Sequence, residues 1–253
     1  MRKCYTTLVP FLKRIIKQSH ATGEMPDELK TAMLLPLLKK ANADSEDLAN
    51  YRPVSNLKFV SKLIEKAVFN QLNGCLTDNG LHVTLQSAYK IFHSTETSLL
   101  RVHNDNVLAL VKGENVLLIL LDLSAAFDTV TVNHSLLLSR LQQRYGLCGT
   151  VLKWFESYLC NRTQFVNINE SYSSKRVLSV DAPQGSVLEP VLYLMYTSPL
   201  RDVIESYNIN YTMYADDSQL YVAFKTNDAS SIKNRIESCV GEICRRMNRN
   251  YLS

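Results

Sequence analysis

The sequence predicts an α+β fold in which helices lie on one face of a mainly antiparallel sheet. Several segments carry apolar residues at helical spacing, two segments have the pattern of β-hairpins, and strands and helices do not alternate regularly. The 253 residues are 46% hydrophobic and 21% charged, which is enough to bury a sizeable core. We therefore expect one compact body.

Composition also excludes several classes of protein. The longest purely apolar run, residues 116–121, is far shorter than the roughly 20 residues that a membrane-spanning helix needs. Lys13, Arg14 and Lys17 interrupt any apolar stretch of signal-peptide length. The six cysteines lack the two-residue spacing of zinc knuckles and redox dithiols. We expect an intracellular protein, in the nucleus or cytoplasm, that is neither secreted nor membrane-spanning.

The first third of the chain is predicted to hold two helices with a strand between them. Apolar residues at helical spacing predict a helix over about residues 6–23. The apolar run 33–38 predicts a short strand with a basic exit. Residues 59–72 carry a second helical stripe, and we expect this helix to end at Gly74 in a left-handed cap.

The middle of the chain is predicted to hold a capped helix and a buried strand. Ser94 or Thr95 can cap the helix, and Gly113 lies beyond its end. Its expected buried side consists of Leu99, Leu100, Val107, Leu108 and Val111. The apolar run 116–121 is too short for a helix, which favours a strand covered on both faces and ending at Asp122.

The last part of the chain is predicted to alternate helices with hairpins. Two helices are expected at residues 133–145 and 151–159. A hairpin is expected over residues 164–180 and a second one over residues 211–224. The final helix is expected at residues 232–247.

Two adjacent carboxylates, Asp216 and Asp217, lie at the predicted tip of the second hairpin. Like charges held this close repel, and partial burial adds to the cost of keeping both ionised. A divalent cation would offset that cost, and magnesium suits a tight turn because it needs few protein oxygens. The dipeptide alone favours a solvated turn, since aspartate is a preferred turn residue.

Asp122 is a third candidate, because a carboxylate at the end of a buried strand lies where open sheets tend to place ligands. The alternative is a helix N-cap, a role that Ser124 could also fill. If Asp122 meets Asp216 and Asp217 in space, the three carboxylates could hold two cations about 4 Å apart. That arrangement serves in-line phosphoryl transfer.

A predicted turn at residues 183–186 leads into a helix. Gly185 permits a close backbone approach, Gln184 offers a donor and an acceptor, and a helix N-terminus favours an anion. Ser186 and Glu189 also have the spacing of a capping box, which needs no ligand. Both interpretations stay open.

Basic side chains of the first 100 residues are candidates for phosphate contacts. They are Lys39, Lys40, Arg52 and Lys90. Scattered lysines more often form a solvated face, so that alternative also stays open.

Five segments hold the most distinctive residue combinations. They read YRPVS at 51–55, QSAYK at 86–90 followed by HSTET at 93–97, LDLSAAFD at 121–128, PQGSVL at 183–188 and YADDSQLY at 214–221. Each is weak alone, but their order and gaps are specific. Together they resemble reverse transcriptases of animal non-long-terminal-repeat, LINE-type retrotransposons, and the resemblance runs from about residue 6 to the end.

This resemblance implies a fingers-and-palm polymerase fold with the thumb missing. Residues 1–50 would be an N-terminal helical extension, 51–115 the fingers and 116–253 a truncated palm. The implied activity is RNA-directed DNA polymerisation with two Mg²⁺ ions, or Mn²⁺, on an RNA template and a DNA primer with dNTPs. The alternatives are an inactive retrotransposon relic that at most binds nucleic acid, and a template-independent nucleotidyl transferase such as a cyclase.

The resemblance also assigns the metal site. Asp122 and Asp216 would ligate both metals, with Asp217 assisting. The main-chain carbonyl of Leu123 would be a further ligand. Phe127 matches the aromatic residue that closes the sugar pocket and excludes a 2′-hydroxyl.

The nucleotide site is implied in the same way. Gln184 and Gly185 match the turn beneath the incoming nucleotide. Arg52, with Lys39 or Lys40, matches the fingers residues that grip its triphosphate. In this chemistry a primer 3′-oxygen attacks the α-phosphate while positive charges neutralise the developing negative charge.

The sequence departs from the family pattern at several places. Asp181 and Ala182 replace the usual Gly and Val ahead of the predicted turn, which is a mild change. Residues 129–134 contain two extra residues, and Asn133 replaces an acid. Glu189 replaces a glycine, which puts a carboxylate near the expected path of the template-primer. The chain ends where the family continues into the primer grip and thumb, which predicts a truncated copy.

Overall fold

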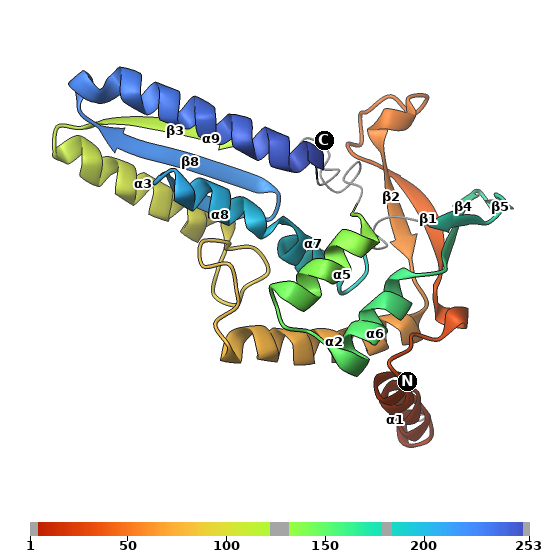
Figure 1. Ribbon diagram of the computed structural model, residues 1–253. Coiled ribbons are helices and arrows are strands. Elements are labelled where there is room, and N and C mark those ends of the chain that lie inside the picture. Colours follow the sequence, from red (N-terminus) through yellow and green to blue (C-terminus); the bar gives the residue numbers. More distant parts are fainter. Residues whose placement is uncertain (1–4, 122–131, 179–183, 250–253) are drawn as a thin grey trace. The chain divides into compact units, whose positions relative to one another are not determined.

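The computed structural model describes residues 5–121, 132–178 and 184–249 (Figure 1). The chain divides into two compact units. Unit 1 comprises residues 1–81 and 131–192, and unit 2 comprises residues 82–130 and 193–253. Each unit therefore combines two segments that are distant in sequence. The predicted division into extension, fingers and palm stays a prediction.

Unit 1 contains a mixed sheet. Its strands are β1 (Thr31–Leu38), β2 (Tyr51–Asn56), β4 (Arg162–Ile168), β5 (Ser171–Tyr172) and β6 (Arg176–Leu178). The order is β2-β1-β4-β5, and β6 also pairs with β4. Only β1 and β4 run parallel among these pairs. The predicted strand is confirmed, and β4 with β6 forms the predicted hairpin, whose connecting segment contains β5.

Helices and two short 3₁₀ turns complete unit 1. They are α1 (Tyr5–Thr22), η2 (Asp27–Leu29), η3 (Leu48–Asn50), α2 (Phe59–Asp78), α5 (His134–Gln143) and α6 (Gly149–Leu159). Helix α1 packs against α2 and α6, and α5 packs against α6. Fully buried side chains such as Ile64, Leu141 and Phe155 form the core between them. The predicted helices are confirmed.

The predicted end of α2 at Gly74 is wrong, because the helix continues to Asp78. Leu72 and Leu76 are both buried, so the apolar stripe holds the extra turn in place. The positive φ expected at Gly74 occurs instead at Gly80, beyond the cap.

Unit 2 contains a three-stranded antiparallel sheet in the order β3-β8-β7. The strands are β3 (Asn115–Leu121), β8 (Asp217–Phe224) and β7 (Asn210–Tyr214). β7 and β8 form the predicted second hairpin, and β3 pairs with β8 along its full length. This sheet confirms the antiparallel part of the predicted fold.

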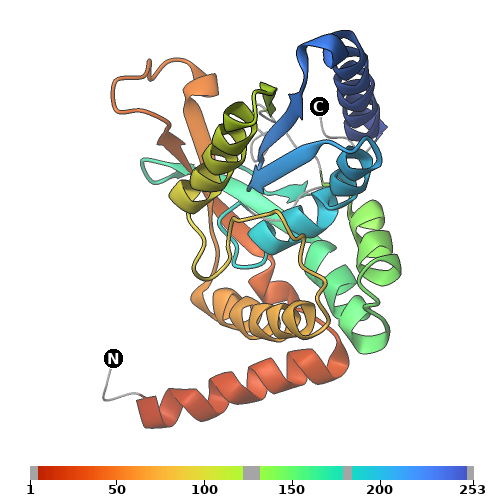
Figure 2. The same ribbon diagram turned by 90° about the vertical axis from the view of Figure 1, so that its left-hand side faces the viewer.

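Helices cover both faces of this sheet, not one face as predicted (Figures 1 and 2). α8 (Pro199–Ser206) and α9 (Ala229–Arg249) pack on the face that carries Leu220 and Val222. Tyr221 points to the opposite face, because side chains alternate along a strand. There its hydroxyl donates to Asp105 of α3 (Thr95–Val111) at 2.6 Å. α7 (Glu189–Thr197) contains the boundary between the units.

The predicted buried side of α3 is wrong, although the helix and its Ser94 cap are confirmed. The exposed residues are Leu99, Leu100, Val107, Leu108 and Val111. Ser98, Val102 and Ala109 are buried instead. Apolar residues occur around much of this helix, so their periodicity alone does not determine which face is buried. The face with small side chains is buried because it lets the helix approach the sheet closely.

The prediction that β3 is buried on both faces is also wrong. Leu118 and Leu120 are 43% and 68% exposed. Leu117, Ile119 and Leu121 point the other way and pack against the core of unit 2. β3 is one of the two edge strands of this three-stranded sheet, and the face that carries Leu118 and Leu120 is only partly covered. In the described part of the chain, no helix is long and apolar enough to cross a bilayer.

Candidate functional site

The turn between β7 and β8 carries the two adjacent carboxylates. Tyr214 pairs with Asp217, so Ala215 and Asp216 form the two-residue connection. The backbone φ of Ala215 is +55°, as the twist of a tight hairpin requires at this position. Asp216 is half-buried and Asp217 is exposed at the start of β8. The carboxylates thus lie at the tip of a rigid hairpin.

A buried tyrosine lies near these carboxylates. Burial is the main cause that raises the pKa of the Tyr193 hydroxyl, and the charge of Asp216 adds to it. Tyr89 and Asp217 contribute in the same direction. Tyr193 therefore keeps its proton and adds no negative charge to a site that already holds two carboxylates. The sequence analysis missed this residue.

The end of β3 lies beside the hairpin, because Leu121 pairs with Ser218. Asp122, Leu123 and Phe127 lie outside the described residues, so their assigned roles stay predictions. Within the described ranges, no group of three or more His, Cys, Asp or Glu side chains that could hold a metal is formed. Paired carboxylates on one turn are nevertheless the hard oxygen donors that suit Mg²⁺.

The Gln184–Gly185 turn lies in unit 1, against β2. The amide of Ser55 donates to the carbonyl of Gln184 at 3.0 Å. Gly185 has a φ of +89°, and a Cβ added there would lie 3.5 Å from the Ser55 carbonyl oxygen. Conformation, more than crowding, thus favours glycine at this position.

The capping interpretation of this turn is confirmed in a modified form. Ser186 Oγ accepts from the amide of Glu189 at 3.0 Å. The Glu189 carboxylate accepts from the amide of Gly185 at 2.9 Å, one residue before the amide that a standard capping box uses. Glu189 therefore binds the turn itself.

A buried glutamate, which the sequence analysis missed, ties α2 to the same turn. Glu65 is completely buried and accepts from Ser61 Oγ at 2.9 Å and from the amide of Val187 at 2.8 Å. Burial raises the pKa of Glu65, and this effect outweighs the lowering by its hydrogen bonds and by Arg162. The sequence signal was a carboxylate within the apolar stripe of α2.

Tyr158 of α6 and Arg162, the first residue of β4, extend this network. The guanidinium of Arg162 lies 4.1 Å from the ring centroid of Tyr158, and its Nε donates to the Tyr158 carbonyl at 2.6 Å. The Tyr158 hydroxyl and Ser186 Oγ are 3.1 Å apart. Both Arg162 and Tyr158 are fully buried. The turn is therefore held from α2 and from α6.

Three of the predicted phosphate contacts lie together. Leu37 of β1 pairs with Arg52 of β2, and Lys39 and Lys40 follow directly after β1. All three basic side chains are exposed. Arg52 and Ser55 share a strand, which links this basic end of the β1–β2 pair to the Gln184 turn.

Lys90, the fourth basic candidate, lies in unit 2. Its ammonium donates to the carbonyl of Val83 at 2.7 Å, and burial lowers its pKa. This bond uses one of the three N–H groups of the ammonium and gives Lys90 a structural role, while its predicted phosphate contact stays a prediction.

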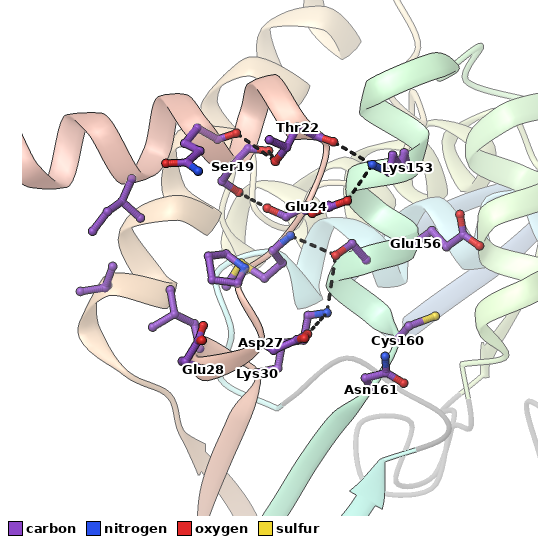
Figure 3. Close-up of a pocket in the computed structure, with 17 residues that line it drawn as sticks. Ser19, Thr22, Glu24, Asp27, Glu28, Lys30, Lys153, Glu156, Cys160 and Asn161 are labelled. Carbon is purple, nitrogen blue, oxygen red and sulfur yellow. Dashed lines mark hydrogen bonds and ion pairs between the residues drawn. The ribbon is translucent and has the colours of Figure 1, made fainter.

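A cavity of about 860 Å³ in unit 1 lies between α1, η2 and α6 (Figure 3). Its polar groups pair with one another: Lys153 binds Glu24 at 2.7 Å, and Ser157 Oγ accepts from the amide of Met25 at 3.0 Å. Lys30 pairs with Asp27 at 2.8 Å. None of the predicted site residues lines it. The contacts of Lys153 and Ser157 attach the segment that follows α1 to α6.

The arrangement is that of a polymerase fold. The chain is similar to a solved structure of apo telomerase from Candida tropicalis truncated from its C-terminal domain. The TM-score is 0.58 at 13% sequence identity, and the match covers 83% of this chain and 47% of that one.

The chain belongs to the reverse transcriptase (RNA-dependent DNA polymerase) family, whose model matches residues 38–250. It is 31% identical over 175 residues to a probable RNA-directed DNA polymerase from transposon BS of Drosophila melanogaster. It is 28% identical over 222 residues to the RNA-directed DNA polymerase from mobile element jockey of the same species. The matches cover 69% and 85% of this chain but 19% and 24% of those relatives. The family predicted from the motifs is confirmed.

Proposed function

We propose that this chain catalyses RNA-directed DNA synthesis. A primer 3′-oxygen bonds to the α-phosphorus of a dNTP, and the bond to the pyrophosphate leaving group breaks. The observation that carries this proposal is the pairing of Leu121 with Ser218, since Asp122 follows Leu121 in the chain and Asp217 precedes Ser218. Three carboxylates next to the ends of two neighbouring strands would then serve one site.

Among the described residues, the adjacent carboxylates of Asp216 and Asp217 have the chemistry of a divalent-metal site. Asp122, Asp216, Asp217 and the carbonyl of Leu123 would hold two Mg²⁺ ions, with Mn²⁺ as a substitute. Bound Mg²⁺ supplies charge neutralisation at the attacking and leaving oxygens. The chain itself presents two of the carboxylates in adjacent positions, Asp216 in the two-residue turn and Asp217 at the start of β8, where their mutual position is restricted.

The nucleotide would be held by residues of unit 1. Arg52, with Lys39 or Lys40, would bind the triphosphate, because all three are exposed at one end of the β1–β2 pair. Gln184 and Gly185 would support the nucleotide from the turn, which the Glu65 network holds in place. Phe127 would close the sugar pocket against a 2′-hydroxyl.

Primer extension tests this function. Full-length protein with poly(rA), oligo(dT), dTTP and Mg²⁺ should incorporate dTMP, and Asp216→Asn should lower the rate by about 100-fold or more, since it removes a charge that the metals require. Asp228→Asn, an exposed carboxylate in the same unit, is the matched control and should retain the rate. Absence of incorporation by the unmodified protein would favour the relic, and incorporation without template would favour another nucleotidyl transferase.

A further inference from the structure

The segment before α3 runs alongside the candidate catalytic hairpin within unit 2. The amide of Met213 donates to the carbonyl of Leu85, and the amide of Ser87 donates to the carbonyl of Met213, both at 2.9 Å. Gln86 and Met213 thus form an isolated parallel bridge. This bridge fixes Gln86 next to the last residues of β7.

The Gln86 side chain reaches from this bridge to the turn. Its Oε1 accepts from the amide of Ala215 at 2.9 Å, and its Nε2 donates to the carbonyl of the same residue at 3.1 Å. Oε1 also accepts from the amide of Ala88 at 3.0 Å. Gln86 is only 3% exposed, so these bonds form out of water. The carboxamide satisfies both main-chain polar groups of Ala215.

Ala215 is a residue that needs such support. Its φ of +55° lies in the left-handed region, which residues with a Cβ seldom adopt. A strained conformation of this kind persists only where the surroundings hold it. Because Ala215 directly precedes Asp216, any change in its backbone angles would redirect both carboxylates.

We propose that Gln86 is a positioning residue for the hairpin that carries Asp216 and Asp217. Its carboxamide holds Ala215 in the left-handed conformation and thereby fixes the direction of the two carboxylates. An amide is required because only a group with a donor and an acceptor bonds both main-chain groups of Ala215. The consequence for catalysis rests on the proposed function, whereas the effect on the hairpin does not.

The first experiment measures the hairpin without activity. Gln86→Met keeps the length of the side chain but removes its two hydrogen bonds to Ala215 and the one from Ala88. In this variant the Ala215 amide should exchange with solvent deuterium at least ~10-fold faster by NMR. Gln142→Met, on the exposed side of α5, is the matched control and should leave this rate unchanged. An unchanged Ala215 exchange rate in folded Gln86→Met, checked by circular dichroism, would overturn the proposal.

The second experiment measures metal binding by the full chain. Mn²⁺ titration followed by electron paramagnetic resonance should give a dissociation constant about 10-fold higher in Gln86→Met. Gln86→Glu keeps an acceptor for the Ala215 amide but loses the donor to its carbonyl, so its Ala215 exchange rate should lie between those of the unmodified protein and Gln86→Met. Equal Mn²⁺ affinities for the unmodified protein and Gln86→Met would contradict the proposal.

A rescue separates positioning from general packing. Glycine adopts a positive φ without penalty, so Gln86→Met combined with Ala215→Gly should regain most of the Mn²⁺ affinity. If Gln86 only packs the segment, the glycine will not restore the affinity, and the proposal fails.

In primer extension, Gln86→Met should lower kcat about 10-fold with little change in KM for the template-primer. If the unmodified protein does not extend primers but Gln86→Met still frees the Ala215 amide, the proposed function fails while the positioning role stands.

Discussion

Glu65 shows how a single side chain couples stability to pH. Its carboxyl group is buried in unit 1, and its pKa is raised above the ordinary value of 4.5, mainly by burial. The folded protein therefore holds this proton more tightly than the unfolded chain does. Stability contributed by the protonated form is complete below pH 4.5 and is lost as the pH rises through the folded pKa.

We expect Glu65→Gln to flatten this part of the pH dependence, because a glutamine has no proton to lose. The free energy of unfolding, measured by urea titration from pH 4.5 to pH 7.5, should fall less with pH in the variant than in the unmodified protein. Glu28→Gln, an exposed carboxylate in the same unit, serves as the control. Parallel curves for the unmodified protein and Glu65→Gln would contradict the raised pKa.

The sequence showed the carboxylate pair but not its supports. Asp216 and Asp217 are conspicuous because two charges interrupt an apolar hairpin pattern. Arg162 and Glu65 are both buried but far apart in the chain, so the position of Glu65 within an apolar stripe does not indicate which residues it contacts. Tyr193 belongs to an apolar helical stripe. That pattern predicts burial but does not indicate whether carboxylates lie near the tyrosine. Tertiary neighbours, not local pattern, define these residues.

At the scale of elements, two glycines illustrate how one residue type has opposite effects. Gly74 lies inside α2, where an added Cβ would meet nothing within 4 Å. Gly185 lies in the turn before α7 with a φ of +89°. Glycine costs free energy in a helix interior, whereas a left-handed turn requires it.

Substituting these glycines should therefore change stability in opposite directions. Gly74→Ala should raise the free energy of unfolding by about 0.5–1 kcal/mol. Gly185→Ala should lower it by about 1–2 kcal/mol, since alanine resists a positive φ. Urea unfolding of the two variants in parallel tests this, and each variant is the control for the other. Equal shifts for both variants would show that backbone conformation does not control these positions.

The start or end of an element was predicted correctly where a specific side-chain hydrogen bond marks it. Ser94 begins α3 through a side-chain bond to the amide of Thr97, a signal visible in the sequence. The glycine at position 74 suggested a stop, but the burial of Leu76 extends the helix past it. Local preference is weak, so packing of the next apolar residue overrides it.

On the scale of the whole molecule, ligand binding at one hairpin should affect unfolding of the chain. Two adjacent carboxylates repel in the folded protein, and a bound cation relieves this repulsion. A ligand that binds only the folded state stabilises it by mass action, so Mg²⁺ at 10 times its dissociation constant contributes about 1.4 kcal/mol.

We therefore expect Mg²⁺ to raise the Tm by about 2–4 °C, as measured by circular dichroism. The double variant Asp216→Asn, Asp217→Asn should lose this shift, whereas Asp228→Asn should keep it. Equal shifts in all three proteins would locate the bound cation elsewhere.

The interleaved order of the chain has a consequence during biosynthesis. β3 pairs with β8, whose residues emerge from the ribosome about 100 positions later. At typical translation speeds of about 5–20 residues per second, β8 is synthesised about 5–20 s after β3. Until then the apolar β3 lacks its only described neighbour in the sheet. During this interval the nascent polypeptide exposes an uncharged, aggregation-prone segment of seven residues, and we expect chaperones to bind it.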